Sequence, residues 1–176
     1  MGAAIDPDRL GDELYAALRG RRTVPPLNGR VPGITIDDAY RVSRRMLERR
    51  LSDGERVIGK KIGVTSKAVQ TMLGVFQPDF GFLTSAMIYD SGARIPIGST
   101  LIQPRAEGEI AFVLARDLVG PGVTEADVLA ATRCVRPCFE IVDSRIHDWK
   151  IQIEDTVADN ASSGVFVLGQ IGRAHV

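Results

Sequence analysis

The sequence predicts an α+β fold in which a helical N-terminal region precedes a mixed β region. Over residues 1–55 the apolar residues recur at helical spacing between capping residues. From residue 56 onward, short extended segments alternate irregularly with short helices, whereas a regular βαβ array alternates strands with helical patterns of about 10–15 residues. We therefore expect a helical region over residues 1–55 and a mixed β domain over residues 56–169.

Two helices are predicted in the N-terminal region. Asp6 and Pro7 supply an N-cap and a proline at the first helical position, and this helix should end at Gly20. Thr35 and Asp38 resemble a capping box, with aspartate in place of the usual glutamate. They open a second helix that should end near residue 51.

The rest of the chain is expected to hold short strands, short helices and loops. The strongest strand signal covers residues 107–114. Further extended segments are expected at residues 57–64, 86–89, 139–142, 149–153 and 164–168 and around Ile95. Helices are expected at residues 66–73 and 125–134, the second stopped by Pro137, and loops at 77–81 and 155–163.

Composition excludes several classes of protein. Lys and Arg number 22 and so do Asp and Glu, and this zero net charge argues against a nucleic-acid binder that works by counterion release. Two cysteines and two histidines make neither a disulfide scaffold nor a good zinc site. No apolar run approaches the ~20 residues of a membrane span, and the first residues lack the apolar stretch of a secretory signal. We expect a cytoplasmic location.

Three glutamates are candidate metal ligands. Glu107 and Glu109 lie two residues apart in the predicted strand, so both side chains point to the same face. If both faces of that strand pack, these carboxylates point into a partly enclosed space, and Glu140 likewise interrupts an apolar strand. Such an oxygen-rich set suits Mg²⁺ or Mn²⁺. Spacing alone leaves a second interpretation open, in which salt bridges pair the glutamates with Arg105, Arg145 or Lys150.

Three polar residues are candidates for contact with a substrate. Lys61 stands between two glycines on an early strand and faces either a substrate or solvent. Asp79 in the turn at residues 77–81 serves either as an acid or base or only as an Asx-turn residue. Ser162 belongs to a polar loop of the kind that holds a carboxylate or only makes turns. The sequence has no phosphate-binding loop, nucleophile elbow or His-Glu-x-x-His motif.

Five separated motifs carry a resemblance to a known family. They are IGKKIGVTSK (residues 58–67), QPDFG (77–81), QPRAEGEIAF (103–112), FEIVDSRI (139–146) and DTVADNASSG (155–164). Over residues 35–169 the chain closely resembles the 2-oxopent-4-enoate (2-keto-4-pentenoate) hydratases of the fumarylacetoacetate hydrolase superfamily. This resemblance implies a mixed β-sheet roll, Glu107, Glu109 and Glu140 as ligands of Mg²⁺ or Mn²⁺, and Lys61, Asp79 and Ser162 as polar active-site residues.

The implied activity is hydration of 2-hydroxypenta-2,4-dienoate to 4-hydroxy-2-oxopentanoate in the meta-cleavage breakdown of aromatic compounds. The resemblance also implies a homo-oligomer that works beside a downstream aldolase. A 4-oxalocrotonate decarboxylase of the same superfamily is the first alternative, although residues 146–151 and the Ser163-Gly164 pair look more like the hydratases. A non-catalytic domain that holds a structural cation is the second alternative.

The last residues are expected not to belong to the fold. QIGRAHV (residues 170–176) is encoded by CAG ATC GGA AGA GCA CAC GTC, which resembles a sequencing adapter. The resembled family continues beyond residues 164–169 with further strands that complete its sheet. We therefore expect residues 1–169 to be the front portion of a larger enzyme, incomplete at its C-terminus, and the activity of this portion alone is left open.

Overall fold

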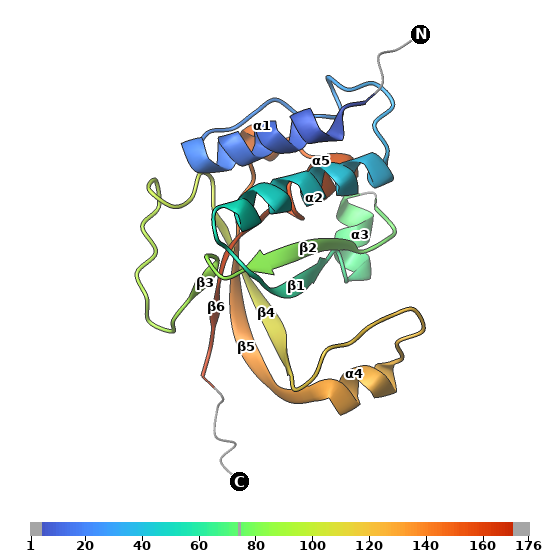
Figure 1. Cartoon of the computed structure of the whole chain (residues 1–176), viewed down its shortest axis with the longest axis vertical. Coiled ribbons are helices and arrows are strands. Elements are labelled where there is room, and N and C mark those ends of the chain that lie inside the picture. The colour runs from blue at the N-terminus through green and yellow to red at the C-terminus, as the bar shows by residue number, and fades with distance from the viewer. Residues whose placement is uncertain (1–4, 74, 171–176) are drawn as a thin grey trace.

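A computed structural model describes residues 5–73 and 75–170, and it has the α+β architecture that the sequence predicts. Helices α1, α2 and α5 lie together at one end, strands β4, β5 and β6 run away from them, and α4 lies at the other end (Figure 1). The elements are α1 (Pro7–Gly20), α2 (Ile36–Ser52), β1 (Val57–Gly63), α3 (Lys67–Leu73), β2 (Asp79–Thr84), β3 (Ile88–Tyr89), β4 (Arg105–Leu114), α4 (Glu125–Ala131), β5 (Thr132–Val142), the 3₁₀ turn η1 (His147–Trp149), α5 (Ile153–Ala158) and β6 (Ser163–Leu168).

Both N-terminal helices begin where their caps predict. The side chain of Asp6 accepts a hydrogen bond from the Arg9 N–H at 3.0 Å, with Pro7 in the first turn of α1. Thr35 and Asp38 form the reciprocal capping box of α2. Each such cap stabilises its helix by about 1 kcal/mol because it satisfies N–H groups that have no partner inside the helix.

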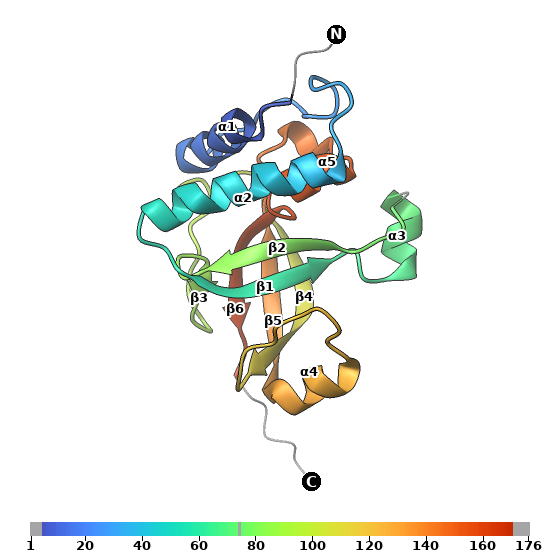
Figure 2. The same ribbon diagram turned by 45° about the vertical axis from the view of Figure 1, so that its right-hand side comes forward.

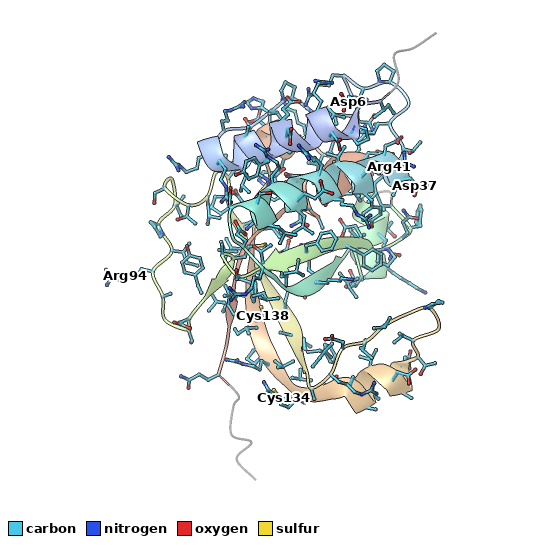
Figure 3. All side chains as sticks on the ribbon, viewed as in Figure 1. Asp6, Asp37, Arg41, Arg94, Cys134 and Cys138 are labelled. Carbon is cyan, nitrogen blue, oxygen red and sulfur yellow. The ribbon has the colours of Figure 1, made fainter. Side chains whose placement is uncertain are left out.

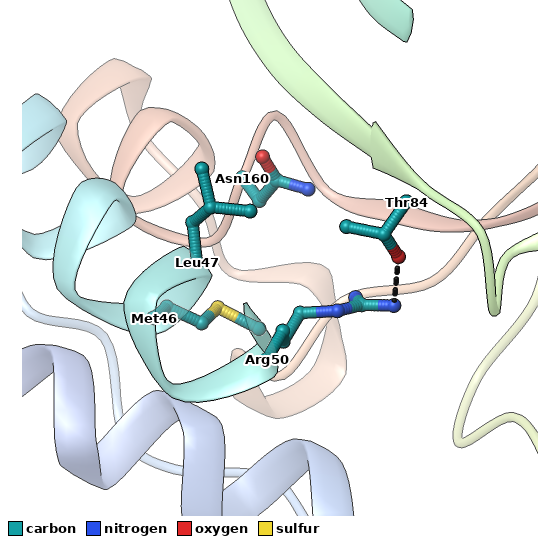
Figure 4. A pocket seen from close by; sticks show the side chains of 5 residues that line it. All are labelled: Met46, Leu47, Arg50, Thr84 and Asn160. Atoms are coloured by element: carbon teal, nitrogen blue, oxygen red, sulfur yellow. Dashed lines mark hydrogen bonds between the residues drawn. The ribbon is translucent and has the colours of Figure 1, made fainter. Parts of the chain in front are cut away.

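The main apolar core lies between the helices and draws residues from both halves of the chain. Leu10 and Leu14 of α1 and Met46 of α2 are buried against Ile146 and Val157. Next to this core, α2 faces β2 and the loop after α5 across a gap too narrow for a water molecule (Figure 4). Arg50 spans the gap and donates to Thr84 Oγ1 at 2.8 Å.

Strands β1 and β2 form an antiparallel hairpin, where the sequence predicts a loop at residues 77–81. That prediction is wrong because long-range packing overrides the turn-forming residues. Gly81 pairs with Lys61 and lies so close to the loop after α5 that a Cβ atom would stand 2.7 Å from the Asn160 carbonyl oxygen. The glycine of the motif therefore permits close approach of the backbone at a strand.

The second sheet has the order β3-β6-β5-β4, in which only β3 and β6 are parallel. The predicted helix over residues 125–134 ends at Ala131, because β5 begins at Thr132. Pro137 lies inside β5 and does not stop a helix. Its carbonyl oxygen accepts a hydrogen bond from the Gly169 N–H at 2.8 Å, just beyond the end of β6, so the residue loses only the donor that proline lacks.

Four further predictions on local structure are wrong or only partly right. Residues 149–153 do not form a strand, because η1 and the start of α5 occupy them. The expected loop at 155–163 is in its first part the helix α5. No strand forms around Ile95, and only Ile88–Tyr89 of the segment 86–89 is extended in a strand. Short segments with mixed periodicity do not separate helix from strand by pattern alone.

The condition under which the sequence places Glu107 and Glu109 in a partly enclosed space, packing of both faces of residues 107–114, is not met in the part of the chain that the structure describes. Glu107 and Glu109 on one face of β4, and Ile110 and Phe112 on the other, are all exposed. No helix among the described residues is long and apolar enough to cross a membrane. The expected adapter-derived tail lies, apart from Gln170, outside the described residues.

Candidate metal and substrate site

The three candidate ligands meet where β4 pairs with β5. Glu107 lies directly opposite Glu140, and Glu109 lies opposite Cys138. One carboxylate oxygen from each of the three glutamates lies within 4.8 Å of the others. Cys138 marks this position on β5, below the β1–β2 hairpin (Figure 3). Three clustered carboxylate oxygens are the donor set that hard divalent cations take, so the residues present fit such an ion.

The pKa of Glu140 is affected by burial and by the two neighbouring carboxylates. Glu140 is buried, and this burial, together with the negative charges of Glu107 and Glu109, raises its pKa. The nearby ammonium of Lys61 opposes the rise. A cation placed among the three carboxylates would remove their mutual repulsion, which is a physical reason for such a cluster to bind one.

Lys61 connects this cluster to the loop after α5. Its Nζ donates to Glu140 Oε1 at 2.7 Å and to the Ala161 carbonyl oxygen at 3.0 Å. The β1–β2 pair that carries Lys61 crosses beside β5 and β6 (Figure 2), and the Lys61 side chain reaches Glu140 on β5 and Ala161 in the loop before β6. Lys61 is thus directed inward rather than toward solvent.

The salt-bridge interpretation of the glutamates named the wrong partners. Arg105 stacks over the Trp149 ring at 4.3 Å, Arg145 pairs with Asp159, and Lys150 pairs with Asp148. Lys61 is the ion-pair partner that the structure gives to Glu140. Sequence could not reveal this pair, because 79 residues separate its members.

Asp79 is buried at the start of β2, with 3% of its surface exposed. Its Oδ2 lies 3.4 Å from the Thr156 hydroxyl, and Oδ1 has no hydrogen-bond partner among the described residues. Burial raises the pKa of Asp79, against the opposing effects of the Lys61 charge and the Thr156 hydroxyl. An unpartnered oxygen and a raised pKa are typical of a functional carboxyl.

Ser162 lies in a strained loop that joins α5 to β6. Asn160, Ala161 and Ser162 have φ angles of 57°, 52° and 50°, the left-handed region that residues other than glycine rarely adopt. The Asn160 side chain fixes the loop to β2, since it accepts from the Phe82 N–H at 2.7 Å and donates to the Phe82 carbonyl at 2.9 Å. Backbone strain held by surrounding contacts in this way is common at active sites.

A fully buried ion pair holds the base of this loop. Arg145 and Asp159 are both 0% exposed, and Arg145 Nε donates to Asp159 Oδ1 at 2.5 Å. The guanidinium also donates to the carbonyl oxygens of Asp159 at 2.6 Å and Ser163 at 2.8 Å. Arginine suits this position because its several N–H groups satisfy several acceptors at once.

The structure therefore brings the six candidate residues into two connected groups. Lys61 joins Glu140 to the loop that carries Ser162, and Thr156 joins Ser162 to Asp79. Sequence reasoning gave no role to Thr156 and placed Asn160 and Asp159 only in a polar loop. All three residues belong to the DTVADNASSG motif, so the motif marked the segment as functional. Its spacing does not reveal which side chains point inward.

Comparison with known proteins places the chain among enzymes of one family. No protein-family model matches it. The chain is 72% identical over 162 residues to a 2-hydroxypent-2,4-dienoate hydratase of Pseudomonas putida, an alignment that covers 92% of this chain and 73% of that protein. It is 65% identical over 161 residues to a 2-hydroxyhexa-2,4-dienoate hydratase of Comamonas testosteroni, with 91% of this chain and 61% of the relative covered.

Solved structures show the same fold. A 4-oxalocrotonate decarboxylase from Pseudomonas putida G7, complexed with magnesium and adipate, superposes with a TM-score of 0.89 at 32% identity. That match covers 96% of this chain and 65% of the decarboxylase chain. The same enzyme complexed with calcium and acetate gives a TM-score of 0.86 at 31% identity. The chain thus spans about three fifths to three quarters of the length of these proteins. It belongs to the 2-hydroxypent-2,4-dienoate (2-keto-4-pentenoate) hydratase family of the fumarylacetoacetate hydrolase superfamily.

Proposed function

We propose that this chain carries the site of a metal-dependent hydratase that converts 2-hydroxypenta-2,4-dienoate to 4-hydroxy-2-oxopentanoate. The observation that carries the proposal is the continuity of the site. A cluster of three carboxylates is joined through Lys61 to a buried acid and a strained serine loop, in a chain 72% identical to a hydratase of this substrate class. The product differs from the substrate by one water molecule, with no change in overall oxidation state. The site must therefore position water and move protons, and it needs no redox group.

Glu107, Glu109 and Glu140 are the residues proposed to hold Mg²⁺ or Mn²⁺. A cation bound there would act as a Lewis acid toward the 2-oxo group of the substrate. Lys61 has two roles in this proposal. It orients Glu140 through their 2.7 Å contact, and its positive charge lies where negative charge on the substrate oxygens can be stabilised.

Asp79 is proposed to supply and recover protons. Ketonisation of the dienol places a proton on C5, and addition of water then places a hydroxyl on C4 and a proton on C3. Because its pKa is raised, Asp79 keeps its proton to higher pH than an ordinary aspartate and can act as the general acid. Ser162 is proposed to bind the 1-carboxylate of the substrate through its hydroxyl.

The decarboxylase alternative rests on the solved structures, which are 4-oxalocrotonate decarboxylases. Identity weighs against it, since the decarboxylase is 32% identical and the hydratase 72% identical to this chain. One assay separates the alternatives. With Mg²⁺ present, loss of the dienol ultraviolet absorbance with formation of the hydroxy-keto acid supports the hydratase, and release of CO₂ from 4-oxalocrotonate supports the decarboxylase. A protein that Mg²⁺ stabilises but that turns over neither substrate is the non-catalytic cation-binding domain.

The ligand assignment predicts the effect of Glu109→Ala. Loss of one carboxylate should lower metal-dependent turnover by at least about 100-fold. Even residues that only hydrogen-bond to metal ligands typically change metal affinity or activity by about 10–100-fold when they are substituted. Mg²⁺ should raise the melting temperature of the unsubstituted protein and not that of the variant. Glu48→Ala removes an exposed glutamate of α2 and serves as the control, with both properties unchanged. Full activity of Glu109→Ala would overturn the assignment.

The proposal extends to assembly. We propose that the enzyme works as a homo-oligomer, and the exposed apolar residues of β4 and β5 support this because such surfaces are normally covered by protein. Association with an aldolase that consumes 4-hydroxy-2-oxopentanoate is a proposal that co-purification of the two enzymes would test. Light scattering measures the oligomeric state directly.

A further inference from the structure

Thr156 stands between the two groups to which the proposed function gives roles in proton transfer and carboxylate binding. Its Oγ1 lies 3.4 Å from Asp79 Oδ2 and 3.1 Å from Ser162 Oγ. Thr156 lies on α5, while Asp79 begins β2 and Ser162 lies in the loop before β6. The three side chains therefore form a continuous row of oxygen atoms drawn from three separate segments.

A hydroxyl group has one proton, and this fixes how the row can be ordered. When Asp79 is ionised it only accepts, so Thr156 donates to Asp79 and must accept from Ser162. The Ser162 proton then points at Thr156, and only lone pairs of Ser162 face a substrate. When Asp79 is protonated, it can donate to Thr156, and Thr156 can donate to Ser162 Oγ. The Ser162 proton is then free to bind a carboxylate.

We propose that Thr156 is a positioning residue whose hydroxyl couples Asp79 to Ser162, so that protonation of Asp79 turns Ser162 into a hydrogen-bond donor for the substrate carboxylate. The coupling makes the site bind its anionic substrate most tightly when the general acid holds its proton. This inference rests on the proposed function for its meaning, but the coupling itself is a property of three side chains and can be measured without turnover.

Several charged or titratable groups face Asp79 and must be separated from the effect of Thr156. Lys61 on β1 lowers the pKa of Asp79 through its charge, and Glu140 lies on the far side of Lys61. Tyr40 on α2 also lies near Asp79: burial raises the pKa of the tyrosine, and the Asp79 carboxylate adds to the rise. These groups act through space, whereas Thr156 is the described residue that bonds to both Asp79 and Ser162.

Thr156→Val tests the coupling because valine keeps the shape and removes the hydroxyl. The Thr156–Asp79 contact is long for an O–H···O bond, so its loss should raise the pKa of Asp79 by about half to one unit. In the pH profile of kcat/KM, the limb on which activity falls as pH rises should move up by the same amount. Thr156→Ser restores the hydroxyl and should restore the profile.

Binding of the unreactive analogue 2-oxopentanoate in saturating Mg²⁺ gives a second readout. The unsubstituted protein should bind it several-fold, about 3–10-fold, more tightly below the pKa of Asp79 than above it. In Thr156→Val the Ser162 proton is free at every pH, so this dependence should largely disappear. At high pH the variant should then bind more tightly than the unsubstituted protein, which simple damage to the site would not produce.

Controls separate the coupling from folding and from the proposed function. Thr132→Val removes a threonine hydroxyl that bonds only the Val128 carbonyl among the described residues, and it should leave both pH profiles unchanged. In an Asp79→Asn background, Thr156→Val should no longer alter the pH dependence of binding. The Asp79 pKa is also read directly by carbon-13 NMR of labelled aspartate, which needs neither substrate nor analogue.

The outcomes are distinguishable. An unchanged Asp79 pKa in Thr156→Val, or failure of Thr156→Ser to restore it, overturns the coupling. A shifted pKa and a lost pH dependence of analogue binding, together with no turnover of the dienoate, uphold the coupling and reject the proposed function. Turnover with a wild-type pH profile in Thr156→Val upholds the hydratase and rejects the coupling.

Discussion

Gly63 leaves the space in which the Asp79 carboxyl lies. The two residues face each other across the β1–β2 hairpin, and a Cβ atom on Gly63 would lie 2.2 Å from Asp79 Oδ1. Real Cβ atoms do not approach so closely, so any side chain at this position must displace the carboxyl. The glycine is therefore required by close approach of Asp79 and not by a turn.

Gly63→Ala should displace Asp79 and lower kcat by about 10–100-fold, a partial loss of the ~10²–10⁴-fold that a positioned general acid contributes. The backbone of Gly63 does not lie in the left-handed region, so alanine can adopt its backbone conformation, and the effect of the substitution comes from contact with Asp79. Gly59→Ala on the same strand is the matched control, since its Cβ would meet Leu83 Cδ1 at an ordinary 3.5 Å. Steady-state rates of the two variants test this, and equal rates would contradict it.

At the residue scale, the sequence reveals which side chains are unusual but not what they touch. Period-two geometry correctly places Glu107 and Glu109 on one face, and a charge inside an apolar strand correctly marks Glu140 as buried. The contact of Glu140 with Lys61 and of Asp79 with Thr156 depends on tertiary structure. Hydrogen bonds between side chains distant in sequence leave no periodic signal.

At the scale of elements, the loop between α5 and β6 depends on the Arg145–Asp159 pair. Both side chains are fully buried, and the guanidinium also binds carbonyl oxygens on either side of the loop. Without this pair, the left-handed residues Asn160 to Ser162 would relax toward ordinary conformations. Lys61 and Thr156 would then lose the Ala161 and Ser162 atoms that they contact.

Asp159→Asn should destabilise the protein by about 3–5 kcal/mol, because it leaves the Arg145 charge buried without a counterion. Urea unfolding at neutral pH measures this loss. Asp12→Asn breaks the Arg45–Asp12 pair on the surface of the helices and should cost less than about 1 kcal/mol. Equal losses in the two variants would show that Arg145 finds another partner and that the pair does not support the loop.

Elements with capping signals or clear apolar strand patterns were predictable, whereas β2 and α5, which depend on their tertiary neighbours, were not. The caps of α1 and α2 involve residues at most three positions apart, so the sequence shows them. Strand β2 contains a proline-preceded turn motif and becomes a strand only because β1 lies beside it. The helix α5 is six residues long, too short for periodicity to identify, and it forms against the helical core.

At the scale of the whole molecule, the helices bury most of their apolar side chains and the sheet does not. The helices bury a continuous core, whereas β4 and β5 leave one face of their sheet open. The residues on that face are Ile110, Phe112, Leu114, Val135 and Phe139. Strand β4 is also an edge strand in the part of the chain that the structure describes. An apolar face beside an unpaired edge favours association with other protein.

In the 176-residue chain this face is expected to pair two copies, and its most exposed members are Ile110 and Phe139, at 68% and 61% exposure. Light scattering should therefore show self-association that increases with protein concentration. Because burial of one large apolar side chain contributes about 1.5–3 kcal/mol, Ile110→Lys should weaken association at least about tenfold. Val119→Lys adds the same charge at an exposed position outside the sheet and should have no such effect. Equal weakening by both variants would attribute association to net charge, and a protein that stays monomeric at every concentration would show that this face does not pair copies of the chain.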